Sequence, residues 1–315
     1  MKILKKILTI TFLFLLASSA ISQIEINLKK SFIESIKDKI TVTLDYNLDA
    51  ANDRNIDVYP DFYSPRGQSI KQSRNSTVLT LAGRNDFIGL PLIAKVFNVK
   101  ADSKAIDIVS NNKGNIIRLN GVWRLWCDYL ENDNIIQGAN NEVIKDYNSK
   151  HVFELAPVLR INKENLNGFD EKINAHRVVD AETAIGKYSS AKCRIVINDS
   201  IVTLITQGLV YDYADFTMQL NSSPEIKDDG MIIFCDVFGD NDNLLFKNLK
   251  MVFIKNSEPE KTVRKLSKGD RLRVLGIPRI DLNEIDSRIK ISETDKQVLD
   301  GNLPFEMIIL SVLDN

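Results

Sequence analysis

Short runs of alternating apolar and polar residues, separated by turns rich in glycine, asparagine and aspartate, recur along most of this chain. Residues 271–275 read Arg-Leu-Arg-Val-Leu and follow the turn Lys268-Gly269-Asp270. An alternation of this kind is the pattern of a strand with one buried face. Many short strands with turn signals between them are typical of small barrels or sandwiches, and not of parallel sheets joined by helices. We therefore predict a mainly β fold with few short helices.

The same reasoning assigns individual elements. Residues 106–109 and 116–119 flank the turn 111–115, which predicts a β-hairpin. Near the predicted linker, the one convincing helical turn is over residues 180–185, where Asp180 can cap it. We found no internal repeat strong enough to align. In the second half we expect strands over residues 193–206, 208–220, 230–238, 249–255, 271–276 and 304–313.

The first 22 residues have the layout of a secretory signal peptide. Lys2, Lys5 and Lys6 precede an apolar run over residues 7–16, and the segment ends in Ala20-Ile21-Ser22. The apolar run is about ten residues long, whereas a membrane span needs about twenty. We therefore expect export to the periplasm or the exterior, with cleavage near Gln23. The alternative is a retained N-terminal anchor.

The rest of the chain is long enough for two domains. We predict an N-terminal β domain over residues 23–166 and a C-terminal β domain over residues 167–315, since residues 162–175 are polar and read as a linker. A composition of 44% hydrophobic and 26% charged residues excludes wholesale disorder. No second apolar stretch is long enough for a membrane span, so we expect none in the mature chain.

Loss of the leader's three lysines would move the formal net charge from -1 to -4. This charge opposes general nucleic-acid binding, which needs a phosphate-neutralising surface, but it permits a local basic groove.

The three cysteines are Cys127, Cys193 and Cys235. A bacterial lipoprotein needs a cysteine directly after its cleavage point, so we do not expect a lipid anchor. An exported disulfide scaffold would carry an even and larger number of cysteines, so the fold should depend on its apolar core. Two alternatives stay open: one bridge between Cys193 and Cys235, or three buried thiols on strands.

One segment resembles a known group of proteins. Residues 121–126 (GVWRLW), a polar excursion and residues 151–158 (HVFELAPV) are similar to a segment of OB-like barrels in poorly characterised exported bacterial proteins. In that group a strand of the form Glu-Leu/Ile-His-Pro-Val follows the loop. Here Ala156 stands in place of the histidine, so no role of that imidazole carries over. The resemblance implies a partly open five-stranded barrel over residues 90–161, whose sheet face and loops would bind oligonucleotides or oligosaccharides.

Two sets of residues are candidates for ligand binding. Period-two geometry puts Arg124 and Trp126 on the face opposite Trp123, where an exposed Trp126 could stack on a base or sugar. The alternative is that Trp126 packs beneath the loop 131–149 with Arg124 over its ring. The second set could neutralise an anionic glycan, a nucleic acid or a lipid headgroup, or it could be a solvated loop and the wet face of an edge strand. It comprises Lys261, Arg264, Lys265, Lys268, Arg271 and Arg273.

Signals for catalysis and for metals are weaker. Asp236, Asp240 and Asp242 supply oxygen ligands of the kind that Ca²⁺ prefers, but they lack the final glutamate of an EF-hand. The two histidines, His151 and His176, have no ligand spacing typical of zinc sites. The chain contains no phosphate-binding glycine loop and no serine or cysteine nucleophile motif. We therefore expect no cofactor.

The function favoured by these patterns is an exported, non-catalytic binding or interaction module for a glycan, a nucleic acid or an envelope protein. One alternative is a periplasmic hydrolase acting on a phosphodiester or a glycan, with carboxylates such as Glu154 assembled only in three dimensions. The other is an envelope assembly or structural protein, which predicts a large exposed apolar patch.

Overall fold

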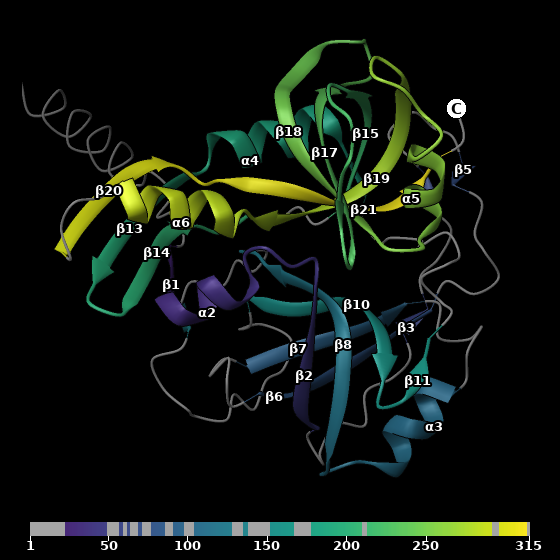
Figure 1. The fold of residues 1–315 in the computed structure, drawn as a ribbon, viewed down its shortest axis with the longest axis vertical. Coiled ribbons are helices and arrows are strands. Elements are labelled where there is room, and N and C mark those ends of the chain that lie inside the picture. Colours follow the sequence, from purple (N-terminus) through teal and green to yellow (C-terminus); the bar gives the residue numbers. More distant parts are fainter. Residues whose placement is uncertain are drawn as a thin grey trace, which may run out of the picture.

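The fold consists of two β-barrels and a third sheet that takes strands from both halves of the chain (Figure 1). A computed structural model describes these parts of the chain, to which all structural statements refer: residues 23–48, 57–58, 62–63, 69–70, 77–85, 91–97, 104–127, 135–137, 152–166, 178–209, 213–291 and 296–313. The predicted leader and both histidines lie outside the described residues.

The first barrel, the lower one in Figure 1, closes in the order β2-β6-β7-β10-β8, with β8 pairing back onto β2. Its third and fifth strands, β7 and β10, are parallel, and the other pairs are antiparallel. The helix α3 joins the third strand to the fourth. These elements are β2 (Thr41–Leu48), β6 (Thr77–Arg84), β7 (Pro91–Phe97), α3 (Lys104–Asn111), β8 (Ile116–Leu125) and β10 (Phe153–Ile161).

The second barrel repeats this topology. It closes in the order β15-β17-β18-β21-β19, with β19 pairing back onto β15, and its third and fifth strands are again the parallel pair. A helix again precedes the fourth strand. The chain is therefore mainly β with OB-like five-stranded barrels, as predicted. The predicted bounds and the partly open form are wrong for the first barrel, because it is closed and takes β2 and β6 from before residue 90. These elements are β15 (Tyr213–Leu220), β17 (Gly230–Phe238), β18 (Leu244–Ile254), α5 (Glu258–Val263), β19 (Arg271–Ile280) and β21 (Phe305–Val312).

The third sheet, here called the central sheet, has the order β20-β13-β14-β1-β9. Two of its strands precede residue 167 and three follow it, so the sheet ties the two halves of the chain together. Its strands are β1 (Gln23–Lys29), β9 (Ile135–Gln137), β13 (Lys192–Asn198), β14 (Ile201–Gln207) and β20 (Lys296–Asn302), and three helices accompany it: α2 (Lys30–Ile36), α4 (Ala181–Ser190) and α6 (Leu282–Ile291).

Short strands complete the described fold. They are β3 (Asp57–Val58), β4 (Phe62–Tyr63), β5 (Ser69–Ile70), β11 (Glu164–Asn165), β12 (Val178–Asp180) and β16 (Glu225–Lys227).

The helix predicted after Asp180 is confirmed as α4. The Asp180 side chain accepts a hydrogen bond from the Thr183 backbone N–H at 2.7 Å, which satisfies one of the unpaired donors of the first turn. The helix extends to Ser190 because Ala184, Ile185 and Tyr188 give it an apolar stripe that is buried in the core.

Two predicted strands are wrong in their details. Residues 106–109 lie in α3, since Ala105 and Val109, four residues apart, bury one face of a helix. Residues 193–206 form a hairpin of β13 and β14, because Asp199 turns the chain with a φ of 50°. In both places burial and turn geometry override the strand preference of a β-branched run.

The three cysteines are free and buried. Burial raises the pKa of Cys193 to about 11 and that of Cys235 to about 12. Of the two alternatives, the bridge is wrong and the three buried thiols are confirmed, although only Cys193 and Cys235 lie on strands and Cys127 follows the end of β8. No helix among the described residues is long and apolar enough to cross a membrane.

Candidate ligand-binding face

Arg124 and Trp126 do not form a surface platform. Their exposed fractions are 2% and 1%, so the expected exposure is wrong. Strand β8 ends at Leu125, and the Trp126 backbone N–H donates to the Val152 carbonyl at 2.9 Å. The Trp126 ring packs edge-to-face on Tyr188, with ring centroids 5.2 Å apart. Trp126 is therefore part of the core.

Arg124 does not stack over Trp126 either. Its Nη1 donates to Glu154 at 3.2 Å, and its Nε donates to the Pro278 carbonyl of the second barrel at 2.9 Å. Lys95 also donates to Glu154, at 2.8 Å. Glu154, a carboxylate that the hydrolase alternative invoked, is thus buried between two cations.

The basic cluster of the sequence divides into two parts. Arg273 is 4% exposed and forms a buried ion pair with Asp215. The prediction that it lies on a solvent-exposed strand face is therefore wrong. Leu275 and Leu313, with Val178 of β12 and Tyr213, form an apolar cluster beside this position. The other five side chains are exposed: Lys261, Arg264, Lys265, Lys268 and Arg271.

The aromatic face is the name we give to an outer surface of the second barrel, formed by Gln219, Asn221, Phe234, Phe238 and Arg271. Alternation along β17 turns Phe234 and Phe238 outward, while Cys235 and Val237 point into the barrel and are buried. Phe234 is 38% exposed. The Arg271 guanidinium lies 4.1 Å from the centre of the Phe238 ring, and its Nε donates to the Gln219 side chain at 2.8 Å.

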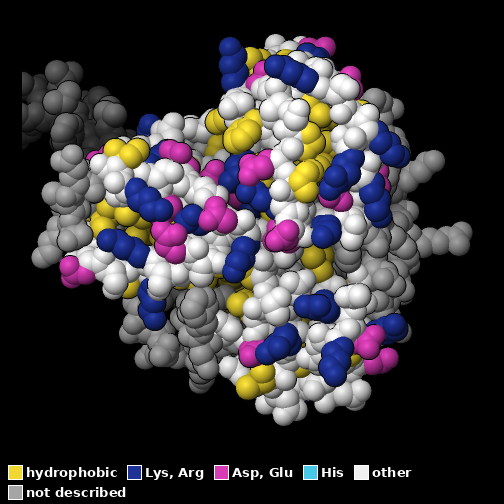
Figure 2. All heavy atoms as spheres, viewed as in Figure 1, with side chains coloured by type: hydrophobic (Ala, Val, Ile, Leu, Met, Phe, Trp, Pro, Cys, Tyr) yellow, Lys and Arg dark blue, Asp and Glu magenta, His cyan; other side chains and the backbone are white. Residues whose placement is uncertain are grey.

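A set of cations, here called the basic rim, lies in α5 and in the segment that leads from α5 to β19. We define it as Lys261, Arg264, Lys265 and Lys268. The turn containing Lys268 is bonded to the end of β15: the Gly269 N–H donates to the Leu220 carbonyl at 2.8 Å, one residue before Asn221. Figure 2 shows several Lys and Arg side chains on the side of this barrel where Figure 1 labels α5.

Some of these cations are already paired. Arg264 contacts Glu260 at 2.7 Å and Arg271 contacts Asp242 at 3.0 Å. Lys265 and Lys268 have no ion pair with any residue that the structure describes. The basic rim therefore offers a small number of cations to a ligand.

The acidic loop after β17 does not gather ligands around one point. Asp236 accepts hydrogen bonds from the Asn221 amide at 2.6 Å and from the Asn248 backbone N–H at 2.9 Å, whereas Asp242 faces Arg271. The Asp240 N–H donates to Glu182. Within the described residues no group of three His, Cys, Asp or Glu side chains is placed to hold a metal ion.

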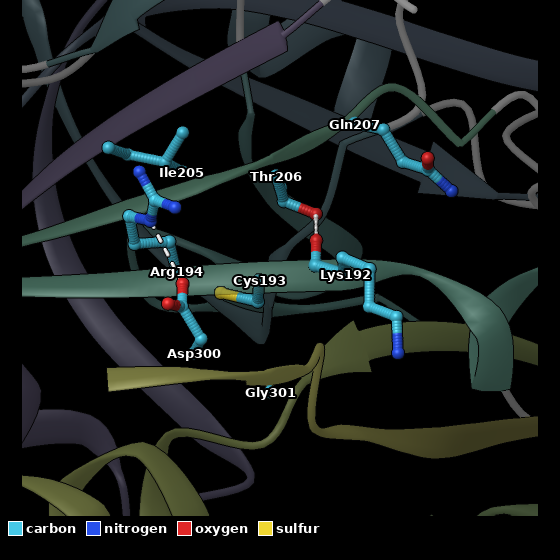
Figure 3. A pocket seen from close by; sticks show the side chains of 8 residues that line it. All are labelled: Lys192, Cys193, Arg194, Ile205, Thr206, Gln207, Asp300 and Gly301. Carbon is cyan, nitrogen blue, oxygen red and sulfur yellow. Dashed lines mark hydrogen bonds and ion pairs between the residues drawn. The ribbon is translucent and has the colours of Figure 1, made fainter. Parts of the chain in front are cut away.

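A groove of about 800 Å³ lies over three strands of the central sheet (Figure 3). In it Arg194 pairs with Asp300 at 2.9 Å, and the Lys192 ammonium donates to the Asn302 amide oxygen at 2.8 Å. Cys193 remains a protonated thiol near neutral pH because burial raises its pKa. The groove could hold a ligand, but its described side chains include no activated nucleophile. It is lined by Lys192, Cys193, Arg194, Ile205, Thr206, Gln207, Asp300 and Gly301.

Comparisons with known proteins supply no family. No protein-family model matches the chain, and no curated protein matches it. Among solved structures, a single-stranded DNA binding protein from Thermus aquaticus is similar over 86% of this chain and 90% of its own, with 13% sequence identity and a TM-score of 0.20. That TM-score is too low to support an argument, so the description of the barrels as OB-like rests on their strand order.

Proposed function

We propose that the second barrel is a non-catalytic binding module for single-stranded nucleic acid. The observation that carries the proposal is the Arg271–Phe238 stack beside the exposed Phe234 on one outer face. Unpaired bases stack on exposed aromatic rings whatever their sequence, at about 1–3 kcal/mol per base. Strands and loops of OB-like barrels offer this kind of surface.

The cations on this face and in the segment that precedes β19 favour an anionic strand over a neutral glycan. Lys265 and Lys268 lack ion-pair partners among the described residues, and Arg271 reaches over the face itself. For a single strand, each neutralised phosphate contributes about -0.7 to the slope of log K against log salt concentration. Three phosphate contacts would therefore give a slope of about -2. The affinity should therefore be modest and depend on salt.

Removing both rings, Phe234→Ala with Phe238→Ala, should weaken binding of a fluorescent oligothymidylate by about 1–3 kcal/mol for each base that stacks. Fluorescence anisotropy on the full chain measures this loss. Both rings are only partly exposed and Phe238 carries the Arg271 stack, so some stability should be lost, and urea unfolding must show that the double variant is folded under the conditions of the binding assay. The control is Ile291→Ala, which removes an 81% exposed apolar side chain away from the aromatic face. Equal binding by the double variant and the control would contradict the proposal.

We also propose that the protein acts after export. The support is the pattern of Lys2, Lys5 and Lys6, the apolar run over residues 7–16 and the small residues before Gln23. N-terminal sequencing of secreted material should find a chain that begins at or near Gln23. A soluble, folded product that still begins with Met1 would count against this proposal and would leave the binding proposal untouched.

A further inference from the structure

The two barrels carry the same short motif on their fourth strands. Residues 118–124 of β8 read Arg-Leu-Asn-Gly-Val-Trp-Arg, and residues 273–279 of β19 read Arg-Val-Leu-Gly-Ile-Pro-Arg, so both have the spacing R-x-x-G-x-x-R. The fifth strands also match, with Phe-Glu-Leu at residues 153–155 and Phe-Glu-Met at residues 305–307. These matches fall at equivalent places in barrels of equal topology.

The matching residues make equivalent contacts between strands of their own barrel. Glu154 lies opposite Arg124 in the strand register, and Glu306 lies opposite Arg279. Each glutamate also contacts a lysine of the third strand, Lys95 at 2.8 Å in the first barrel and Lys250 at 2.7 Å in the second. Each barrel therefore holds a buried glutamate between an arginine and a lysine.

The two arginines then reach across to the other barrel in a reciprocal way. Arg124 Nε donates to the Pro278 carbonyl at 2.9 Å, and Arg279 Nη1 donates to the Trp123 carbonyl at 3.1 Å. Each acceptor is the residue immediately before the other arginine. Such an exchange, in which i contacts j and j contacts i, is the mark of a two-fold interface between equal surfaces.

The apolar contacts between the barrels show the same equivalence. Val122 and Ile277 each follow the motif glycine, and Ala156 and Ile308 each stand two residues after the matched glutamate. All four are buried in one cluster that contains residues of both barrels. The interface therefore pairs corresponding positions of two similar surfaces.

We propose that the barrels form an internal pseudo-dimer and that the Arg124–Arg279 clasp fixes their relative orientation. Apolar burial is non-directional, so the Val122–Ile277 cluster alone would tolerate sliding. A hydrogen bond from a guanidinium N–H to a backbone carbonyl is directional. It forms only when the two barrels are aligned so that the donor faces that carbonyl. The clasp is thus a conformational device, separate from the aromatic face. It adds two reciprocal directional bonds to the other links between the halves, which are the central sheet and Asp229, an acceptor for the Ile40 and Thr41 backbone N–H groups at 2.8 and 2.7 Å.

Spin-label distances across the interface test this proposal on the full chain. Ser110→Cys in α3 and Asn241→Cys in the β17–β18 turn introduce exposed thiols, one in each barrel. The native cysteines are buried, and burial raises the pKa of Cys193 and Cys235 to about 11 and about 12, so they should resist labelling. The chain without introduced cysteines controls for label uptake. The parent should give a single narrow distance distribution.

The clasp variant is Arg124→Lys with Arg279→Lys, which keeps both positive charges beside the glutamates but removes the guanidinium fork. We expect loss of the single narrow distance, with an unchanged far-ultraviolet circular dichroism spectrum. Arg118→Lys is the matched control, because Arg118 belongs to the same motif but pairs with exposed Asp45 inside its own barrel. That control should keep the narrow distance.

A distance distribution in the clasp variant as narrow as in the parent, at the same mean, would overturn the proposal. If the double variant does not fold, each single variant keeps one arm of the clasp. The two-fold equivalence predicts the same partial broadening for Arg124→Lys as for Arg279→Lys. An unchanged distribution in both single variants would overturn the proposal equally.

Discussion

Glu306→Ala is expected to destabilise the protein by about 3–5 kcal/mol, the cost of leaving a buried charge without its partner. Glu306 is 1% exposed, and it contacts Arg279 at 2.5 Å and Lys250 at 2.7 Å. Arg279 itself is 1% exposed, with its guanidinium 3.8 Å from the centre of the Trp123 ring. Removal of the carboxylate therefore leaves a guanidinium that water cannot reach. Urea unfolding followed by circular dichroism measures the loss.

Asp300→Ala is the matched control for this prediction. It breaks the Arg194–Asp300 pair, whose side chains are 58% and 68% exposed. Exposed pairs are screened by water and salt, so its midpoint of unfolding should hardly move. If Glu306→Ala and Asp300→Ala lose the same free energy of unfolding, burial of Glu306 does not explain the destabilisation, and the prediction is contradicted.

Trp126→Ala should cost about 3–5 kcal/mol of the free energy of unfolding, since it empties a large buried site. Trp126 is 1% exposed and lies at one end of an aromatic series that passes through Tyr188 and Phe305 to Phe246, with ring centroids 5.2 to 5.6 Å apart. This series joins the first barrel to α4 and the second barrel. The truncation should therefore weaken the junction as well as the local core.

Trp126→Phe separates ring packing from the polar group of the indole. Among the described residues the Trp126 Nε1 has no hydrogen-bond partner, so the ring nitrogen brings a desolvation cost with no bond in return. Phenylalanine keeps most of the ring contact and removes that cost. Trp126→Phe should therefore lower the free energy of unfolding much less than Trp126→Ala does. If the alanine variant unfolds at the same urea concentration as the parent, Trp126 is not part of the core.

The parts of the fold that the sequence predicted well are those with a local cause. The strand predicted over residues 230–238 is confirmed as β17, and the Asp180 cap is confirmed at the start of α4. A strand period and a capping side chain act within a few residues, so neighbouring sequence is enough to find them.

The errors came where a distant element changes the surroundings of a residue. Alternation placed Arg124 on an outer face correctly, but that face meets the second barrel at Pro278, so the side chain is buried. Arg273 likewise lies on an outer strand face and is buried against Asp215. Nothing in the sequence near these residues says which outer face another barrel will cover.

The candidate site was missed for a related reason. Phe234 and Phe238 stand in an apolar strand, and sequence alone does not distinguish core rings from exposed rings there. Their spacing of four residues, with Cys235 and Val237 on the other face, was the available signal. The R-x-x-G-x-x-R repeat was also present in the sequence, but its two copies, 118–124 and 273–279, are too short to align until the strand order shows that they are equivalent.

Photo-crosslinking tests most directly the claim that the aromatic face of the second barrel binds single-stranded nucleic acid. An oligothymidylate containing 4-thiothymidine is irradiated with the full chain, and mass spectrometry locates the linked peptides. We predict crosslinks to peptides that contain Phe234 or Phe238, together with the neighbouring segment from Lys265 to Arg271. Crosslinks confined to the first barrel or to the groove at Lys192 and Arg194, or no crosslink at low salt, would contradict the account.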